Sequence, residues 1–441
     1  MPRERKNNHH PNEIPTLGPA KIVSPLMVNP DYRAFTRFVN DKTRVMAHIT
    51  WVDGEPPEEN ELMFECAGPR EKIYFDPSKL KVAVVSCGGL CPGINSVVRS
   101  LVLELYHIYG VNNIVGIKFG FQGFIPQYGH DLVELSPQTV SDVHGRGGSF
   151  LGMSRGSQDI GEIVDALERL NIGLLYIIGG DGTLHAANLI TEEITRRGLK
   201  TGVIGIPKTI DNDIAMVDMT FGFSSAVEAA ARVIRGAHNE SISAPHGVGL
   251  VKVMGRHSGY VAAHATLSLK DVNFCLIPEV DFDLEGPKGL LAAVEERVKD
   301  RGHAVILVAE GAGQQYCVLD EECDASGNAR LGDIGTVLRD RIVEHFQEKG
   351  LELNLKYIDP SYEIRSVPAN ANDRIYCGFL GQMAVHAGMA GKTGMVISML
   401  NNKFVHVPIK MAIKERKLIN PNGTLWLSIL ESTGQPMLKN D

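Results

Sequence analysis

From Lys81 onward, short runs of apolar and β-branched residues alternate with glycine-rich turns and helix-like stretches. Apolar strands separated by helical segments are typical of a parallel sheet that helices cover on both faces. The pattern therefore predicts repeated βα units of the doubly wound kind, with ligands bound at the carboxyl ends of the strands. The predicted strands are residues 82–86, 114–119, 174–178, 202–206, 248–253, 272–277 and 304–309, and the predicted helices are residues 95–109, 160–170, 184–197, 224–239 and 284–300.

The first 79 residues follow a different pattern. They contain prolines at a density that excludes long helices, and they include an acidic cluster between residues 55 and 61. We interpret residues 1–79 as an N-terminal extension whose apolar runs, such as residues 46–52, pack on the main body.

Composition narrows the class of protein. The chain has 441 residues, of which 44% are hydrophobic and 22% charged, as expected for a globular protein with a core. Its net charge of −8 makes it a poor non-specific binder of nucleic acid. The seven cysteines include no CxxC pair, which indicates reduced thiols. Because there is no membrane-spanning apolar run and no secretory signal in residues 1–11, we expect a cytosolic protein with no nucleic-acid or membrane partner.

Two glycine-rich turns are candidates for binding phosphate. The turn at residues 88–95 follows a predicted strand and opens a helix, and residues 147–156 place Arg155 among glycines. Glycine lets backbone amides approach a phosphate, and a helix N-terminus attracts its charge. Neither turn is a Walker A loop. Glycine required only for packing, or a mobile loop with a solvated arginine, explains them equally well.

The turn at residues 179–183, Gly-Gly-Asp-Gly-Thr, carries more information. Asp181 lies at the end of a predicted buried strand, where a carboxylate can hold Mg²⁺ or its waters while adjacent amides take phosphate oxygens. The same motif occurs in lipid kinases and NAD kinases. It therefore predicts nucleotide phosphates and a metal without naming a substrate.

Two carboxylates, Asp211 and Asp213, follow the predicted strand at 202–206. If the backbone is extended, both side chains point the same way. Like charges kept from water are costly unless a metal, a cation or a proton is shared, and Lys208 could offset them locally. An acid–base role is therefore favoured over a plain turn rich in Asp and Asn.

Further charged residues follow the later strands. The sequence Met-Gly-Arg at residues 254–256 comes directly after the predicted strand at 248–253, and Glu310 comes after the strand that ends at residue 309. Lys356 and Arg365 place two cations near one segment, which suits a phosphate-bearing substrate.

Taken together, these motifs resemble the phosphofructokinase family. The strings GGLCPGIN, GGDGT, PKTIDND, MGRHSG, AEG and YEIR occur in the family's order and at similar spacings, over about residues 80–410. The long form, with PKTIDND and KYIDPSYEIR, is most similar to the ATP-dependent enzymes of plants and some protists. The resemblance implies transfer of the γ-phosphoryl group of ATP to the C1 hydroxyl of fructose 6-phosphate, giving fructose 1,6-bisphosphate and ADP in glycolysis. It also implies Mg²⁺ as cofactor and a homo-oligomer, either a tetramer or a dimer.

The resemblance further implies a role for each site residue. Asp211 would be the general base, with Arg256 and Asp213 completing the catalytic set. Asp181 would hold Mg²⁺. The residues implied to bind ATP are Gly89, Arg155, Gly156, Gly180, Asp181, Gly182 and Thr183, and those implied to bind the sugar phosphate are Thr209, Ile210, Asp211, Met254, Gly255, Arg256, Glu310, Lys356, Tyr362 and Arg365.

Two residues bear on the phosphoryl donor. Gly182 leaves room for a nucleotide where pyrophosphate-dependent relatives commonly carry aspartate, whereas Lys208 is also typical of those relatives. ATP is favoured, and a pyrophosphate-dependent phosphotransferase and a catalytically silent regulatory subunit are the alternatives. A lipid or NAD kinase is disfavoured because those families lack TIDND with a downstream MGR.

The chain also departs from the bacterial members of the family. Tyr362 replaces a histidine and Lys356 an arginine, and an arginine expected from the partner subunit falls at Gly247. A bacterial effector-site arginine falls at Leu103, although Arg99 remains. Bacterial activation by ADP therefore does not follow from the resemblance.

The expected fold is α/β, with two Rossmann-like doubly wound domains and an N-terminal extension. The predicted divisions are the extension at 1–79, an ATP- and Mg²⁺-binding domain at 80–221 plus about 369–420, a sugar-phosphate-binding domain at 222–368, and a C-terminal tail at 421–441.

Overall fold

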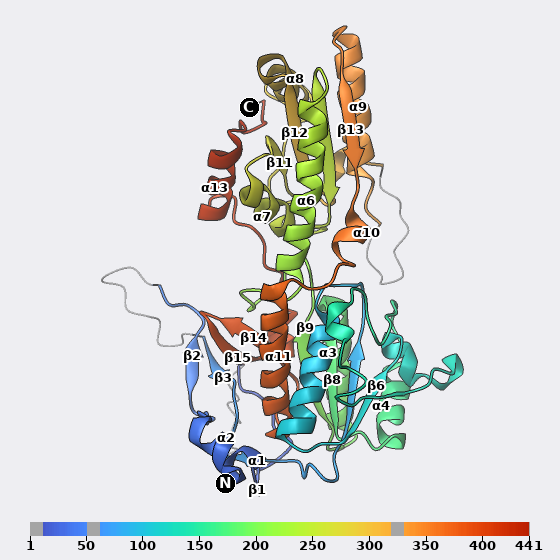
Figure 1. Cartoon of the computed structure of the whole chain (residues 1–441), viewed down its shortest axis with the longest axis vertical. Coiled ribbons are helices and arrows are strands. Elements are labelled where there is room, and N and C mark those ends of the chain that lie inside the picture. The colour runs from blue at the N-terminus through green and yellow to red at the C-terminus, as the bar shows by residue number, and fades with distance from the viewer. Residues whose placement is uncertain (1–11, 51–61, 319–329, 441) are drawn as a thin grey trace, which may run out of the picture. The chain divides into compact units, whose positions relative to one another are not determined.

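The computed structural model describes residues 12–50, 62–318 and 330–440. The predicted apolar run at 46–52 therefore lies partly outside the described residues. The described chain divides into two compact α/β units (Figure 1). The first unit comprises the described residues up to Lys208 together with Ile214–Thr220 and Arg374–Glu415, and the second comprises Thr209–Asp213, Phe221–Asp373 and the residues from Arg416 on.

The first unit is built on a mixed sheet. Its nine described strands have the order β2-β3-β15-β14-β9-β8-β5-β6-β7, and the central strands β9, β8, β5 and β6 run parallel. This parallel centre confirms the doubly wound prediction. The strands of this unit are β1 (Ile22–Val23), β2 (Arg44–Met46), β3 (Met63–Cys66), β4 (Lys72–Ile73), β5 (Lys81–Ser86), β6 (Asn113–Ile117), β7 (Val133–Glu134), β8 (Leu174–Gly179), β9 (Gly202–Pro207), β14 (Met395–Leu400) and β15 (Lys403–Pro408), with β1 and β4 forming a separate pair.

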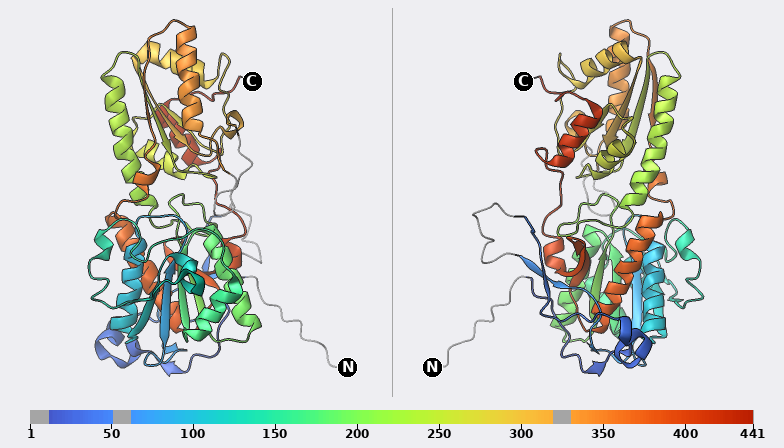
Figure 2. Two further views of the ribbon diagram at one scale, coloured as in Figure 1. Left: turned by 90° about the vertical axis from the view of Figure 1, so that its right-hand side faces the viewer. Right: turned by 60° about the vertical axis from the view of Figure 1, so that its left-hand side comes forward.

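Helices cover both faces of this sheet (Figures 1 and 2). Ala83 and Val85 of β5 belong to a core cluster with side chains of α4 and α5. The alternate residues Val82 and Val84 are also fully buried, so the opposite face is covered too, on the side where α3 and α11 lie together. The helices are α1 (Pro25–Val28), α2 (Pro30–Phe35), α3 (Ile94–Leu103), which continues as a π-helical turn at Glu104–Ile108, α4 (Ile160–Arg169), α5 (Asp181–Arg196), α11 (Ala371–Met389) and α12 (Ile409–Ala412).

An antiparallel extension of the sheet was not predicted. β14 and β15 form a hairpin whose two turn residues, Asn401 and Asn402, have φ values of 51° and 60°. Asparagine tolerates this left-handed conformation, which matches the right-handed twist of paired strands. β3 pairs with β15, and β2 pairs with β3, so residues within the predicted extension are part of the main sheet.

Buried charges tie β3 to the C-terminal hairpin. Glu65 of β3 accepts hydrogen bonds from Arg70 Nη2 at 2.8 Å and from Lys392 Nζ at 3.1 Å, and its Oε1 lies 3.0 Å from Nδ1 of His406. All four residues are buried. Although burial opposes ionisation, His406 and Lys392 lower the pKa of Glu65 to about 2. This cluster fixes β3 against β15.

The second unit contains a four-stranded parallel sheet among its described residues, with the order β11-β12-β10-β13. Helices α8 and α9 pack on one face of it, and α6 lies on the other (Figure 2). Its strands are β10 (Gly247–Val253), β11 (Phe274–Leu276), β12 (His303–Ala309) and β13 (Asn354–Ile358), and its helices are α6 (Phe223–Ile242), α7 (Tyr260–Leu269), α8 (Leu290–Arg301), α9 (Ile334–Glu348), α10 (Ser361–Ile364) and α13 (Thr424–Thr433).

One helix of this unit begins later than predicted. The helix expected at 284–300 is α8, which starts at Leu290 with Gly289 as its N-cap. Gly286 has a φ of 91°, and Pro287 disfavours helical backbone in the residue before it. The early start was therefore wrong for a reason that the sequence contains. None of the described helices is both long and apolar enough to cross a membrane.

We predict that Glu65→Ala lowers the free energy of unfolding by about 1.5–3 kcal/mol, because Arg70 and Lys392 would lose their buried carboxylate and keep only the more exposed Asp41 as a shared partner. Urea unfolding measures the change, with the exposed Glu71→Ala as control. Since the pKa of Glu65 is lowered, its contribution is present above pH 4.5 and is lost as the pH falls towards 2. Equal stabilities of the two variants would contradict the prediction.

Candidate functional site

In the first unit, four predicted segments meet at the carboxyl ends of β5, β8 and β9. The amide of Gly88, after β5, donates to Ser154 O at 3.2 Å, and the amide of Lys208, after β9, donates to Gly179 O at 2.9 Å. α3 begins after Gly93 and α5 begins after Gly180, so two helix N-termini open at this edge. Such termini present free backbone amides that favour anions.

Lys208 holds the first of these turns. It is buried, and its Nζ donates to Gly89 O at 2.7 Å. Gly88 has a φ of 89°, and a side chain at this position would lie 3.7 Å from Lys208 Nζ and 3.8 Å from Thr183 Oγ1. Gly88, Gly89, Thr183 and Lys208 are therefore close neighbours. Lys208 is an internal cation of the glycine cluster rather than a surface residue.

The remaining residues predicted to bind nucleotide differ in exposure. Asp181 is the first residue of α5 and is partly exposed. Gly182 is exposed, and a Cβ added there would meet none of the described atoms within 4 Å. Arg155 and Gly156 are exposed and follow Ser154, whose carbonyl bonds Gly88. Arg155 is therefore adjacent in sequence to a residue that bonds the glycine cluster. It forms no ion pair with the other described residues predicted to bind ATP.

In the second unit, Thr209 organises the turn that carries the two carboxylates. Its Oγ1 accepts from the amide of Asp211 at 3.0 Å and donates to Asp213 Oδ1 at 3.2 Å. Asn212 has a φ of 54°, so the backbone between the two aspartates is left-handed. The premise that it is extended was wrong, and a Thr-closed turn is what keeps the carboxylates together. Ile210, within this turn, is buried.

Asp211 occupies an electrostatically strained position. Its Oδ1 is buried and has no hydrogen-bond partner among the described residues. Burial and the negative charges of Asp213 and Glu310 raise the pKa of Asp211 to about 8, although Arg416 and Arg256 oppose the rise. A carboxyl group with a pKa near neutrality, set by burial and by specific charges, has the properties of a general base.

The turn after β10 lies beside this carboxylate. Ser258 Oγ donates to Asp211 O at 3.1 Å, and the amide of Gly311 donates to Gly255 O at 3.1 Å. Gly255 has a φ of 132°, and a Cβ there would lie 2.6 Å from Ser258 O, so glycine is required. Met254 and Arg256, its neighbours in the turn, are partly exposed. Burial raises the pKa of Glu310, which the charge of Arg256 opposes.

A partly buried lysine organises the last predicted segment. Lys252 of β10 contacts Asp333 Oδ1 at 2.8 Å and Asp359 Oδ2 at 3.0 Å. Although its burial opposes this, hydrogen bonds to the two aspartates raise the pKa of Lys252. Asp359 also accepts from the amide of Ser361 at 3.1 Å, where α10 begins. Lys252 thereby fixes the start of the short helix at Ser361–Ile364.

The predicted phosphate-binding residues at this end are less closely grouped. Arg365 lies over the ring of Tyr362, 4.6 Å from its centroid, and Tyr362 is 76% exposed. Lys356 is exposed within β13, opposite Gly249, and no hydrogen bond or ion pair joins it to other described residues of the group. The structure therefore brings Tyr362 and Arg365 together but not Lys356.

Sequence reasoning missed Arg416. Its Nη1 donates to Asp213 Oδ2 at 2.9 Å, and its charge opposes the raised pKa of Asp211. Arg416 stands in the charged run at residues 414–417, which has the composition of an ordinary surface segment. No pattern in the sequence separates it from its neighbours. Lys252 could have been found more easily than Arg416. It lies inside a predicted apolar strand, where a charged side chain needs a partner.

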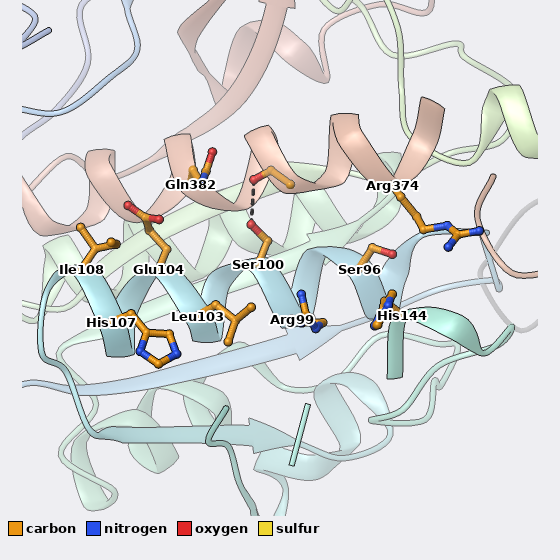
Figure 3. A pocket seen from close by; sticks show the side chains of 11 residues that line it. Ser96, Arg99, Ser100, Leu103, Glu104, His107, Ile108, His144, Arg374 and Gln382 are labelled. Carbon is orange, nitrogen blue, oxygen red and sulfur yellow. Dashed lines mark hydrogen bonds between the residues drawn. The ribbon is translucent and has the colours of Figure 1, made fainter. Parts of the chain in front are cut away.

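A cavity of about 410 Å³ lies elsewhere in the first unit, between α3 and α11 (Figure 3). Arg99, Leu103, Glu104 and Arg374 are among its lining residues. Burial raises the pKa of Glu104 to about 7. None of the residues predicted to bind ATP or the sugar phosphate lines this cavity, so it is separate from the candidate site.

Comparisons with known proteins agree with the arrangement of motifs. Residues 81–388 match the family described as Phosphofructokinase. The chain is 50% identical to an ATP-dependent 6-phosphofructokinase of Borreliella burgdorferi over 99% of both chains, and 44% identical to ATP-dependent 6-phosphofructokinase 7 of Arabidopsis thaliana over 94% of this chain and 85% of that one.

The fold is also similar to that of solved phosphofructokinase structures. A pyrophosphate-dependent phosphofructokinase from Marinobacter aquaeolei aligns with a TM-score of 0.66 over 80% of this chain and 91% of that chain. At 18% identity this likeness bears on the fold alone. Because the family match spans most of the chain and the relatives cover nearly all of it, this chain belongs to the phosphofructokinase family.

Proposed function

We propose that this chain transfers the γ-phosphoryl group of ATP to the C1 hydroxyl of fructose 6-phosphate, giving fructose 1,6-bisphosphate and ADP. The observation that carries the proposal is the carboxylate of Asp211, whose Oδ1 is buried without a hydrogen-bond partner among the described residues and whose pKa is raised by burial and by Asp213 and Glu310. A hydroxyl that attacks phosphorus must lose its proton, and a carboxylate poised near neutral pH accepts it well.

The donor binds at the glycine cluster of the first unit. Gly89, Gly180, Gly182 and Thr183 present backbone amides near two helix N-termini, which suit the phosphate chain. Arg155 and Gly156 extend this surface. Lys208 stays bonded to Gly89 O and so holds the turn in shape.

Mg²⁺ fits this donor site. It prefers oxygen ligands and is usually held by one or two carboxylates together with substrate phosphates. The described residues contain no cluster of three His, Cys, Asp or Glu that could bind a metal, so a phosphate-borne ion with Asp181 as its protein ligand agrees with the donor set. When bound, the ion neutralises charge on the phosphates.

The acceptor binds at the second unit. Asp211 takes the proton of the C1 hydroxyl, and Thr209 holds the backbone of Asp211 in place. Asp213 raises the proton affinity of Asp211, and Arg256 offsets the charge of the transferred group. Met254, Gly255 and Glu310 contact the sugar. Tyr362 and Arg365 bind the 6-phosphate end, with Lys356 as a further cation.

The alternatives are less well supported. The relatives with high identity are named as ATP-dependent, and Gly182 leaves the space that an ATP phosphate chain needs. A silent regulatory subunit would have no need of a base with a raised pKa. Assembly into a homo-oligomer and a location in the cytosol stay predictions from the sequence.

We predict that Asp211→Ser lowers kcat by about 10²–10⁴-fold, because the attacking hydroxyl loses its proton acceptor. The KM for fructose 6-phosphate should change little. A coupled assay with ATP measures both constants, and Asp300→Ser on the exposed side of α8 serves as control. Near-normal turnover of the Asp211 variant would remove this residue from the mechanism.

We predict that Gly182→Asp raises the KM for ATP at least about tenfold, which corresponds to 1.4 kcal/mol of repulsion between the added carboxylate and the phosphates. Gly182→Ala is the matched control, since a Cβ there meets no described atom within 4 Å and brings no charge. Steady-state kinetics with varied ATP compare the three proteins. If the two substitutions have the same effect, charge at position 182 does not govern donor binding.

We predict that Lys252→Met raises the KM for fructose 6-phosphate about tenfold and leaves the KM for ATP unchanged, because Asp359 would no longer fix the segment of Tyr362 and Arg365. Asp359→Asn should reproduce the effect. Asp333→Asn, which removes the other partner of Lys252, should reproduce it only weakly. An equal rise in both KM values would point to general loss of structure instead.

A further inference from the structure

A short segment near the C-terminal end of the chain, residues 416–419, runs along the turn that carries Asp211. We name it the strap. Arg416 donates from Nη1 to Asp213 Oδ2 at 2.9 Å, and the next residue, Lys417, donates its amide to Asp213 O at 2.9 Å. Side chain and backbone of the strap thus bind both the carboxylate and the backbone of one aspartate.

The strap is also fastened to the turn after β10. Tyr260 Oη donates to Leu418 O at 3.0 Å, and the amide of Ile419 donates to Glu279 Oε1 at 3.0 Å. Glu279 in turn accepts from the amide of Gly259 at 3.0 Å. Because Gly259 and Tyr260 follow Arg256 closely in the chain, the strap is joined to both segments of the proposed acceptor site.

The charges around Asp211 come from four segments. Asp213 lies in its own turn, Glu310 follows β12, Arg256 follows β10, and Arg416 lies in the strap. Asp213 and Glu310 disfavour a negative charge on Asp211, and the two arginines favour it. Arg416 is paired with Asp213, and 36% of the Arg416 side chain is exposed.

We propose that Arg416 is a positioning residue of the phosphoryl transfer. By pairing with Asp213 it increases the ionised fraction of Asp211, so that the C-terminal strap sets the lowest pH at which the base works. This inference rests on the proposed function, in which Asp211 is the general base. The charge of Arg416 acts on Asp211 both directly and through its pairing with Asp213, and its effect is therefore on the proton affinity of Asp211 rather than on binding of the sugar phosphate.

The sign of the effect follows from the charges. Without Arg416, two neighbouring carboxylates share one cation fewer, so the ionised form of Asp211 is disfavoured and its pKa rises. Activity would then be lost at low pH and recovered at high pH. A partner that only supported the fold would lower activity at every pH alike.

The test is the pH dependence of kcat/KM for fructose 6-phosphate, measured on the full chain at saturating ATP. For Arg416→Met and Arg416→Gln we expect the acid limb to move up by about one pH unit, so that activity falls about tenfold near pH 7 and recovers near pH 10. Arg416→Lys should restore most of the wild-type profile. Lys414→Met, an exposed neighbour that loses the same charge, should leave the profile unchanged.

A second test uses the Asp213→Asn protein as the starting point, in case a single Arg416 variant folds poorly. In Asp213→Asn the charge that Arg416 neutralises is gone, so adding Arg416→Met should move the acid limb by clearly less than in the wild-type background, through the direct effect of the Arg416 charge on Asp211 alone. An unmoved limb in every Arg416 variant, or a shift of equal size in both backgrounds, would overturn the inference. If instead the wild-type chain fails to phosphorylate fructose 6-phosphate with ATP, the proposed function itself falls, and the two failures are distinguished by that control.

Discussion

Two carboxylates held side by side in a nearly dry turn are the constraint around which the second unit is arranged. Asp211 and Asp213 repel each other, and burial increases the cost because water cannot screen them. The turn persists because Thr209 bonds both residues, Ser258 bonds its backbone and Arg416 pairs with Asp213. Thr209 belongs to the turn itself, whereas Ser258 and Arg416 are distant in the sequence, so the turn depends on both local and long-range partners.

In the first unit, the corresponding constraint is a set of glycine turns that must stay open to an anion. Its glycine turns leave backbone amides open to an anion, and Lys208 supplies an internal cation that ties the end of β9 to the turn after β5. The sheet that carries these turns is extended by antiparallel strands, which a buried carboxylate, Glu65, joins to cations at Arg70 and Lys392. In both units, a buried charge is stable because a partner distant in the sequence satisfies it.

The sequence predicted those features that local pattern determines. Apolar runs such as the one at β8 located the central strands, and the glycine turns at their carboxyl ends located the candidate site. The helix start at Leu290 could have been predicted from Pro287, and the hairpin at Asn401 and Asn402 from its turn residues. The left-handed backbone of Asn212 could not, because it depends on the hydrogen bonds of Thr209.

Long-range partners lay beyond sequence reasoning. Arg416 is separated from Asp213 by 203 positions, and Lys392 from Glu65 by 327, so nothing local marks either pair. The central claim is that the chain uses ATP to phosphorylate the C1 hydroxyl of fructose 6-phosphate. The most direct measurement compares ATP with pyrophosphate as donor in a coupled assay of the purified full chain. We predict robust formation of fructose 1,6-bisphosphate with ATP and little with pyrophosphate. Turnover with pyrophosphate alone, or with neither donor, would contradict the account.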